Sequence, residues 1–334
     1  MLVFSITLIK IHEHPHLFSL KVYYSIEDIP VINNPVLTLG TFDGVHLGHQ
    51  EIIALLKESA SKINGETVLF TFHPHPRIVL HPDDHGMKLI QSIDERIKKL
   101  EAFGIDHLIL FPFSVDFSRL SATEFVRDIL VNKINVQLMT IGYNHHFGRN
   151  REGNIALLRE LAAVYDFDVQ EIPAFSKEDI NISSTKIRDA IEAGEISKAN
   201  DFMGDYFEFE GIVQKGDQIG TKIGFPTANI EMTCKNQVIP VNGVYAVSVE
   251  FEGNTYQGMM NIGTRPTISL SNENRIEVHI FNFNQMIYGR DLRIKIYDRI
   301  RSEQTFGSLE NLKEQLEHDK KASLIILDKH IVGD

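Results

Sequence analysis

The sequence is poor in cysteine, with Cys234 as the only one among 334 residues. A single thiol cannot form an internal disulfide or build a cysteine-based metal cluster, which agrees with a reducing compartment. The chain also lacks any apolar run that approaches the roughly 20 residues needed to span a bilayer. Residues 1–9 are too short for a secretory signal and have no basic residues before them. These absences predict a cytoplasmic protein without membrane segments.

Positive charge is also in short supply, because 33 lysine and arginine residues stand against 45 aspartate and glutamate residues, giving a formal net charge of −12. Proteins that bind nucleic acids or anionic membrane surfaces rely on basic residues that attract those partners regardless of sequence. The charge balance therefore argues against both kinds of partner. Any phosphate-bearing partner must be held by a local group of residues.

The composition that is present, 43% hydrophobic and 23% charged residues, is close to the average of soluble globular proteins. A chain of 334 residues exceeds what one core usually serves, so the length predicts two domains. We expect a first domain over residues 21–192, a linker over 193–205 and a second domain over 206–334. Residues 1–20 show no clear helix or strand period and are expected to form an N-terminal extension.

The first half of the chain alternates short apolar runs with amphipathic stretches. Such alternation is typical of a parallel sheet covered by helices on both faces. Ligands of these sheets bind at the carboxyl ends of the strands. The expected strands span residues 36–39, 67–71, 107–111 and 137–141, and the expected helices span residues 50–60, 93–103, 122–131 and 155–165.

After about Phe202 the pattern changes to short β-type runs separated by glycine, asparagine and proline. We expect a mostly β domain, folded as a small barrel, so the fold class is α/β plus β. Ser308 is a plausible N-cap for a final helix, with Leu309, Leu312 and Leu316 at helical spacing. The expected strands span residues 207–213, 243–251, 256–262, 276–283 and 291–297.

The run from Gly40 to His49 reads Gly-Thr-Phe-Asp-Gly-Val-His-Leu-Gly-His. It follows an apolar strand and leads into a helix, so its backbone amides lie where a helix N-terminus attracts anions. His46 and His49 would face one side of that helix, while Gly48 lets a phosphate or adenine approach the backbone. The pattern indicates a triphosphate site, although a tight turn with incidental histidines is a serious alternative.

Residues 182–188, Ile-Ser-Ser-Thr-Lys-Ile-Arg, indicate a second anion site. Their hydroxyls stand at N-cap positions, and Arg188 lies in the helix that follows. Alone, the Ser-Ser-Thr run would mean only a helix cap. Its presence beside the first motif favours phosphate binding over an ordinary turn.

At these residues the sequence resembles the bifunctional bacterial riboflavin kinase and FMN adenylyltransferase family, usually called FAD synthetase. Residues 40–49 are similar to its H-x-G-H nucleotidyltransferase signature, 72–76 to its flavin-side loop, 142–153 to its F-G-x-x-R-x-G segment and 182–188 to its I-S-S-T-x-[IV]-R motif. The resemblance covers nearly everything from Lys21 to the C-terminus. It implies a Rossmann-like nucleotidyltransferase domain, followed by a small β-barrel riboflavin kinase domain with a terminal helix.

In the first domain, the resemblance implies that the FMN phosphate attacks the α-phosphorus of ATP and releases pyrophosphate, with no covalent enzyme intermediate. Asp43 could orient a metal or a histidine, but an aspartate beside glycine is also an ordinary turn residue. Family members often carry acidic or arginine residues in 143–146, where this chain has Tyr-Asn-His-His, so the flavin contacts stay open. The implied catalytic residues are His46 and His49. The implied ATP-site residues are Gly40, Phe42, Asp43, Gly44, His46, Gly48, His49, Ser184, Thr185 and Arg188, and the flavin-side residues are His73, Pro74 and Phe147.

In the second domain, three glycines at intervals of four match neither a Walker loop nor a dinucleotide fingerprint, and alone they would indicate only flexible loops. The run Gly-Phe-Pro-Thr-Ala-Asn that begins at the last of them resembles the family's kinase motif and implies Thr227 and Asn229 as Mg²⁺ ligands, which suits an ion that prefers oxygen. Glu277 matches the family's catalytic glutamate, and a base is needed because an alcohol is scarcely ionised at pH 7. Without the resemblance, a strand glutamate is usually only solvated. The implied ATP and flavin contacts are Gly216, Gly220, Gly224, Pro226 and Arg265.

The implied substrates are riboflavin, FMN and ATP, with Mg²⁺ as cofactor and FMN and FAD as products, while the oligomeric state stays open. Two other functions are weighed against this one. A nucleotidyltransferase for another small phosphate compound would not need Glu277 or the kinase motif. A flavin-binding regulator without catalysis would be expected to have damaged motifs. Residues 12–16 fit the letters of a zinc-protease motif, but Pro15 would disrupt the required helical turn.

Overall fold

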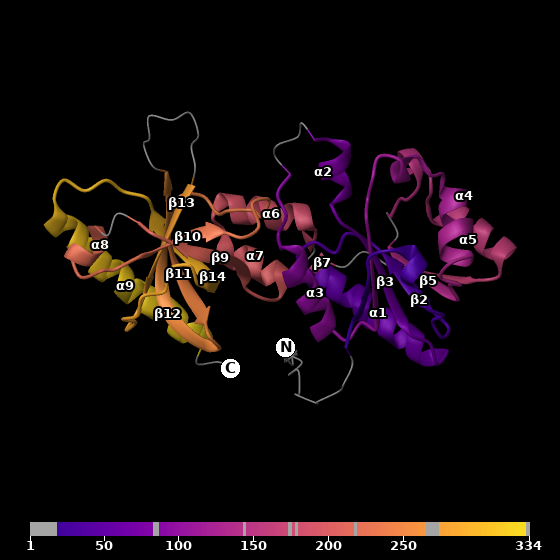
Figure 1. Ribbon diagram of the computed structural model, residues 1–334, viewed down its shortest axis with the longest axis horizontal. Coiled ribbons are helices and arrows are strands. Elements are labelled where there is room, and N and C mark those ends of the chain that lie inside the picture. The colour runs from indigo at the N-terminus through magenta and orange to yellow at the C-terminus, as the bar shows by residue number, and fades with distance from the viewer. Residues whose placement is uncertain are drawn as a thin grey trace, which may run out of the picture.

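The computed structural model describes residues 19–82, 87–142, 145–172, 176–177, 180–216, 219–264 and 274–331. Two parts lie side by side along the long axis, with the helices α6 (Ser184–Ala193) and α7 (Ile196–Met203) between them (Figure 1). The first part is a sheet layered with helices, and the second is a barrel flanked by a long helix. This arrangement confirms the predicted fold class of α/β plus β.

The first part contains a six-stranded parallel sheet, ordered β1-β4-β3-β2-β5-β6. Its central strands are almost wholly buried, as expected when helices cover both faces. The four predicted strands are all present, while the two edge strands, β1 and β6, were not predicted because they are short and partly polar. The strands are β1 (Lys21–Tyr23), β2 (Val36–Leu39), β3 (Thr67–Phe72), β4 (His107–Phe111), β5 (Leu138–Gly142) and β6 (Asp168–Ile172).

The helices cover both faces of this sheet, as predicted. One face packs against α1 (Leu47–Lys62) and α3 (Ile93–Ala102), whose side chains share a core with β2, β3 and β4. The opposite face packs against α5 (Ile155–Tyr165) and the segment from 122 to 131. That segment begins as α4 (Ala122–Glu124) and continues as a π-helix, η3 (Phe125–Val131), where an α-helix was expected.

Shorter elements complete the first part. They are η1 (Ile26–Asp28), α2 (Pro76–Leu80), η2 (Phe117–Arg119), η4 (Arg149–Arg151) and the strand pair β7 (Ser176–Lys177) and β8 (Ile180–Asn181). Among them, α2 and η4 lie next to the cavity described below. The irregular segments of this part thus gather around the carboxyl ends of the sheet.

The second part is a closed antiparallel barrel ordered β10-β13-β12-β11-β14-β9. Residues along β9 alternate between buried and partly exposed, so one face of the strand fills the barrel core. Five of its strands were predicted, and β10 was not. The strands are β9 (Phe207–Gln214), β10 (Ala228–Met232), β11 (Gly243–Phe251), β12 (Asn254–Thr264), β13 (Asn274–Ile280) and β14 (Asp291–Ser302).

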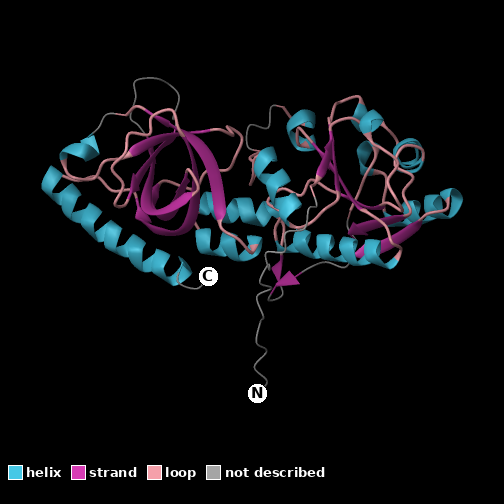
Figure 2. Cartoon of the chain, turned by 60° about the horizontal axis from the view of Figure 1, so that its bottom comes forward, coloured by secondary structure: helices cyan, strands magenta, loops and turns pink. Residues whose placement is uncertain are grey.

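The final helix, α9 (Leu309–Ile331), begins where the sequence predicts and lies along the outside of the barrel (Figure 2). Its N-cap is Ser308, whose Oγ accepts a hydrogen bond from the Asn311 amide at 3.1 Å. A one-turn helix, α8 (Ile219–Lys222), follows β9. The helix α9 packs against β11, β12 and β14 and forms one wall of a cavity in this domain.

The segment expected to be a linker, 193–205, contains the helix α7, which packs against β9 and β14. Ile196, Ala199 and Met203 of this helix are buried and join a core cluster that continues into the barrel. The same cluster includes Ile90 from the first part. The two parts therefore share one apolar core across their junction.

Candidate active sites

The loop after β2 has an unusual backbone. Phe42, Gly44 and Val45 have φ angles of 48°, 89° and 39°, values that residues other than glycine rarely adopt. A Cβ on Gly40 would lie 2.9 Å from the Phe42 ring, so the glycine lets that ring fold back over the loop. The loop ends at His46, the N-cap of α1, whose Nδ1 accepts a hydrogen bond from the His49 amide at 3.3 Å. The predicted motif thus lies at the carboxyl end of a central strand and at a helix N-terminus.

The two predicted catalytic imidazoles lie against each other. The rings of His46 and His49 stack with their centroids 3.7 Å apart and their planes at 15°. Burial lowers the pKa of His46 to about 4, and the charge of Arg188 acts in the same direction. Burial and the proximity of His46 also hold the pKa of His49 well below its usual value. Both rings are therefore neutral near pH 7 when no anion is present.

The second predicted anion motif meets the first one. The helix α6 is capped by Ser183, and Ser184 Oγ donates to the backbone oxygen of Asp43 at 2.9 Å. Arg188 Nη1 lies 2.8 Å from Asp43 Oδ2, and its Nη2 lies 3.4 Å from Thr185 Oγ1. Two helix N-termini, each favourable for anions, thus converge on one loop.

Beside this loop is a cavity of about 800 Å³, bounded by the ends of β2, β3 and β5. Gly40, Phe42 and His49 line it, as does Phe147, which was predicted on the flavin side. Burial lowers the pKa values of two further lining histidines, His75 and His145, to about 4. A cluster of aromatic rings forms much of the far wall. Its lining members are Phe72, Phe113, Phe117, Phe125 and Phe147.

The structure places some predicted residues away from this cavity. Phe72, His75 and Pro76 line the cavity, whereas His73 and Pro74, which lie between them in sequence, do not. Asp43 does not line it either. Its carboxylate is fully buried and accepts hydrogen bonds from Ile90 and Arg188. The predicted roles of these three residues stay predictions.

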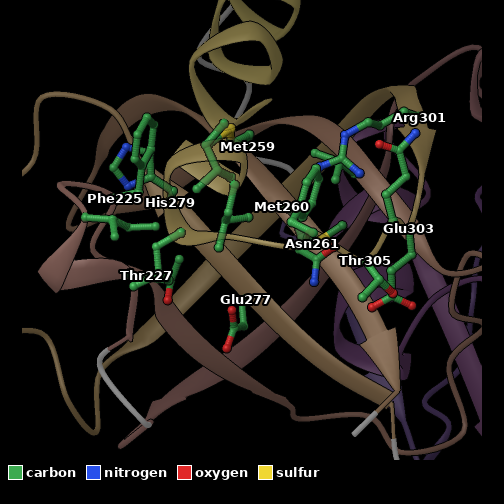
Figure 3. Close-up of a pocket in the computed structure, with 18 of the residues that line it drawn as sticks. Phe225, Thr227, Met259, Met260, Asn261, Glu277, His279, Arg301, Glu303 and Thr305 are labelled. Atoms are coloured by element: carbon green, nitrogen blue, oxygen red, sulfur yellow. The ribbon is translucent and has the colours of Figure 1, made fainter. Parts of the chain in front are cut away.

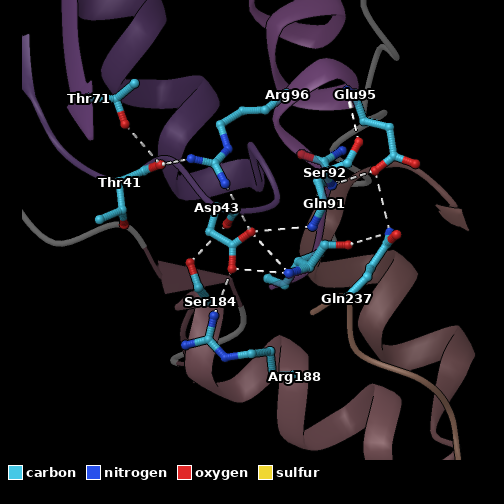
Figure 4. Close-up of polar contacts among 11 residues, drawn as sticks. Thr41, Asp43, Thr71, Gln91, Ser92, Glu95, Arg96, Ser184, Arg188 and Gln237 are labelled. Atoms are coloured by element: carbon cyan, nitrogen blue, oxygen red, sulfur yellow. Dashed lines mark hydrogen bonds and ion pairs between the residues drawn. The ribbon is translucent and has the colours of Figure 1, made fainter. Parts of the chain in front are cut away.

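Sequence reasoning missed Arg96, a guanidinium whose side chain is only 2% exposed (Figure 4). Its Nη1 donates to the Thr41 backbone oxygen at 2.8 Å, and its Nη2 lies 3.7 Å from Asp43 Oδ1. The signal was present, since Arg96 lies one turn before the buried Leu100 on the core-facing stripe of α3. A charged residue on such a stripe indicates a buried partner.

The barrel holds a second cavity, of about 670 Å³, between its strands and α9 (Figure 3). Glu277 lies on β13, directly across from Asn229 of β10 on one side and Asn261 of β12 on the other. The predicted base and one predicted magnesium ligand are therefore neighbours in the strand register. Thr227, the other predicted ligand, lines the cavity with Glu277, whereas Asn229 is not among the lining residues.

Arg275 connects these groups. Its guanidinium forms an ion pair with Glu277, and its Nε donates to Asn229 Oδ1 at 2.8 Å. A Cβ on Gly216 would lie only 1.9 Å from Asn229 Nδ2, so only glycine leaves room for that side chain. Arg275 was not predicted from the sequence. It lies two residues before Glu277 on β13 and therefore occupies the same face of the strand.

The remaining predicted kinase residues shape the loop before β10. A Cβ on Gly220 would lie 2.1 Å from the Phe225 oxygen, while Gly224 has a φ of 87°. The Pro226 oxygen lies 2.7 Å from Nδ1 of His279, which lines the cavity. Arg265 lies outside the described residues.

Comparison with known proteins finds a matching family for each half of the chain. The sequence pattern described as FAD synthetase matches residues 29–186, and the one described as riboflavin kinase matches residues 203–327. A bifunctional riboflavin kinase/FMN adenylyltransferase from Bacillus subtilis is 36% identical over 295 residues, which cover 86% of this chain and 91% of that protein. The chain belongs to this family.

Other relatives agree with this family. A protein with the same description from Buchnera aphidicola subsp. Schizaphis graminum is 39% identical, and the match covers 90% of this chain and 96% of that protein. Another, from Escherichia coli K12, is 36% identical, and the match covers 85% of this chain and 90% of that protein. A crystal structure described as a macrolide-efflux protein from Streptococcus pneumoniae has a TM-score of 0.82 at 33% identity, covering 90% of this chain and 97% of that one. In the described part of this chain, no helix has the length and apolarity to cross a membrane.

Proposed function

We propose that the barrel domain phosphorylates riboflavin to FMN and that the first domain transfers the adenylyl group of ATP to FMN, giving FAD and pyrophosphate. The observation that carries this proposal is that each domain contains its own cavity and that part of that domain's predicted motif lines it. Family membership over both domains supports it. Riboflavin, FMN and ATP are the proposed small-molecule partners. Location in the cytoplasm stays a prediction from the sequence.

For the kinase step, we assign Glu277 as the base that accepts a proton from the terminal hydroxyl of riboflavin. The hydroxyl oxygen then attacks the γ-phosphorus of ATP, and ADP leaves. Glu277 suits this role because it lines the cavity on a rigid strand and is held in place by Arg275. A side chain fixed in this way needs little reorganisation at the moment of reaction.

Mg²⁺ is proposed at Thr227 and Asn229. The donor chemistry fits, because a hydroxyl and an amide oxygen lie beside the carboxylate of Glu277, and Mg²⁺ prefers a few oxygen ligands plus substrate phosphates. Bound there, the ion would neutralise charge on the ATP phosphates. The Asn229 oxygen accepts from Arg275 Nε at 2.8 Å, so binding of the ion there would require Arg275 to release it.

For adenylyl transfer, the FMN phosphate is already a competent nucleophile near pH 7, so the site needs to position the reactants and to stabilise charge. We assign His46 and His49, with Arg188 and the N-termini of α1 and α6, to the phosphates of ATP. Neutral imidazoles that gain a phosphate neighbour bind protons more readily, which compensates the anionic charge. His46 is buried, and His49 lines the cavity beside it.

The flavin ring is proposed to bind against the aromatic wall of the first cavity. Phe72, Phe117 and Phe147 offer apolar faces, and flat rings pack favourably against such surfaces. Polar groups next to these rings in sequence also line the cavity, among them Ser118 and His146. The flavin-side roles of His73 and Pro74, which lie between Phe72 and His75, stay predictions.

The proposal is tested by incubating the purified protein with riboflavin, ATP and Mg²⁺ and separating the flavins by chromatography over time. FMN is expected first and FAD later. A second incubation supplies FMN directly, so that adenylyl transfer is measured without the kinase step. Absence of both products would reject the function, and FMN without FAD in either incubation would reject the role of the first domain.

A further inference from the structure

A buried polar cluster joins the two domains behind the first site (Figure 4). At its centre is Asp43, which is fully buried. The two carboxylate oxygens lie 3.0 and 3.1 Å from the backbone nitrogen of Ile90, and Oδ1 also accepts from the Gln91 amide at 3.3 Å. Oδ2 receives Arg188 at 2.8 Å. The carboxylate therefore links a loop before α3 to the arginine of α6.

That loop is itself held by the barrel domain. Leu89 donates to the Asn236 oxygen at 2.7 Å and accepts from the Val238 amide at 2.8 Å, so the two segments form a parallel bridge. Between them lies Gln237, whose side chain is 1% exposed. Its Nε2 donates to the Ile90 oxygen at 3.0 Å and to the Glu208 oxygen at 2.8 Å.

The two backbone groups of Ile90 thus bond to opposite sides of the junction. Its N–H points to Asp43 and its oxygen accepts from Gln237, while its side chain lies in the core that both domains share. We propose that Gln237, a residue of the kinase domain, is a positioning residue for adenylyl transfer that acts through Ile90 and Asp43 on Arg188. This inference rests on the proposed adenylyl transfer in the first domain.

The physical basis is the cost of leaving buried carbonyls without donors. Loss of the Gln237 amide would leave the oxygens of Ile90 and Glu208 unsatisfied in a dry junction, and the loop would move to find new partners. Asp43 would then lose the amides that fix its carboxylate. Arg188 holds its orientation through that carboxylate, and its own side chain is only 13% exposed.

The kinase site should not respond in the same way. Gln237 does not line the barrel cavity, and the residues in register with Glu277 come from β10 and β12, whereas Gln237 contacts β9. The effect is therefore expected in one reaction of the two. This asymmetry separates a positioning role from a general loss of structure.

The test uses the full chain with Gln237→Met, which keeps the length of the side chain but removes its donor, and with Gln237→Ala. Gln257→Ala, a glutamine on β12 of the same domain, is the matched control. With FMN supplied, we expect both Gln237 variants to raise the KM for ATP about tenfold, the size of one lost buried hydrogen bond, and to leave the KM for FMN within twofold. Riboflavin phosphorylation should change less than twofold, and the control should change neither reaction.

A double variant tests the route. In an Arg188→Ala background, Gln237→Met should add no further loss, because the two residues act on the same step. Additive losses would overturn the route, and equal losses of both reactions would overturn the positioning role. Thermal melting shows whether the Gln237→Met variant is folded. If the unmodified chain makes FAD and the folded variant keeps the same KM for ATP, the positioning role of Gln237 is wrong while the proposed adenylyl transfer stands. If the unmodified chain makes no FAD, the proposed adenylyl transfer fails.

Discussion

The two cavities are built by different means. In the barrel, Glu277, Asn229 and Asn261 lie side by side on three paired strands, so a single sheet register brings the proposed base and one proposed magnesium ligand together. In the first domain, the corresponding groups come from two loops and two helix N-termini, and their common anchor, Asp43, depends on the junction with the barrel. Rigid strands fix the first set by themselves. The second set needs contacts from distant parts of the chain.

The largest expected effect tests whether the strand register carries the kinase reaction alone. Glu277→Ala should lower the rate of FMN formation about 1,000-fold, within the range for losing a general base, and should leave adenylation of supplied FMN unchanged. Both rates are measured by flavin chromatography. Glu250→Ala, another strand glutamate of the barrel, should keep both reactions. Loss of adenylation in Glu277→Ala would show that the sites are not separate.

The next largest effect is expected in the first domain, where a variant should impair adenylyl transfer and spare the kinase reaction. His49→Ala should lower FAD formation from FMN about 100-fold, the size typical of losing one group that stabilises developing charge. Riboflavin phosphorylation should continue at its normal rate. His318→Ala, an exposed histidine of α9, serves as the control. A normal rate of FAD formation in His49→Ala would remove this ring from the mechanism.

A smaller effect probes how closely the barrel site is packed. Gly216→Ala places a Cβ within 1.9 Å of Asn229 Nδ2, so the asparagine must move, and we expect roughly a tenfold loss of kinase kcat/KM. Gly307→Ala is the matched control, because a Cβ there meets nothing within 4 Å. Steady-state kinetics with riboflavin measure both variants. Equal rates for the two would mean that the position of Asn229 does not matter.

The smallest effect concerns acid stability, which should separate the histidine-rich first cavity from the barrel. The folded-state pKa of His145 is about 4, below the value of about 6.5 for an unfolded histidine, so the unfolded chain binds more protons between these values. Stability is therefore lost as the pH falls from 6.5 toward 4. His145→Gln should reduce this loss by on the order of 1 kcal/mol, measured by denaturant unfolding at pH 7 and pH 5. An unchanged difference between the two pH values would contradict the assignment.

Periodicity predicted most of the regular elements but not their finer form. The pattern over residues 122–131 fits a helix, yet part of it is a π-helix, in which the Asn132 amide bonds back to the Arg127 oxygen, five residues earlier. Apolar spacing does not separate the two forms over so short a span. The strand β10 was missed because its residues, Ala-Asn-Ile-Glu-Met, lack a β-branched run.

The sequence also contained a sign of the helix α7 that was not used. Ile196, Ala199 and Met203 are spaced as one face of a helix, and Gly204 follows as a left-handed cap with a φ of 67°. A segment with that pattern has an apolar face to bury. Its burial against the barrel follows from that face.

The family and the fold class could be predicted from the sequence, because the motifs that indicate them are local: a strand, a glycine-rich turn and a helix that carries histidines, and the run that includes Thr227 and Asn229. The contacts of Asp43 with Ile90 and Arg188, and the contact of Gln237 with Ile90, are visible only in the folded chain. The contact between Gln237 and Ile90 joins residues 147 positions apart, and one partner is a backbone oxygen. Every residue has such an oxygen, so a contact of this kind leaves no mark in the sequence pattern.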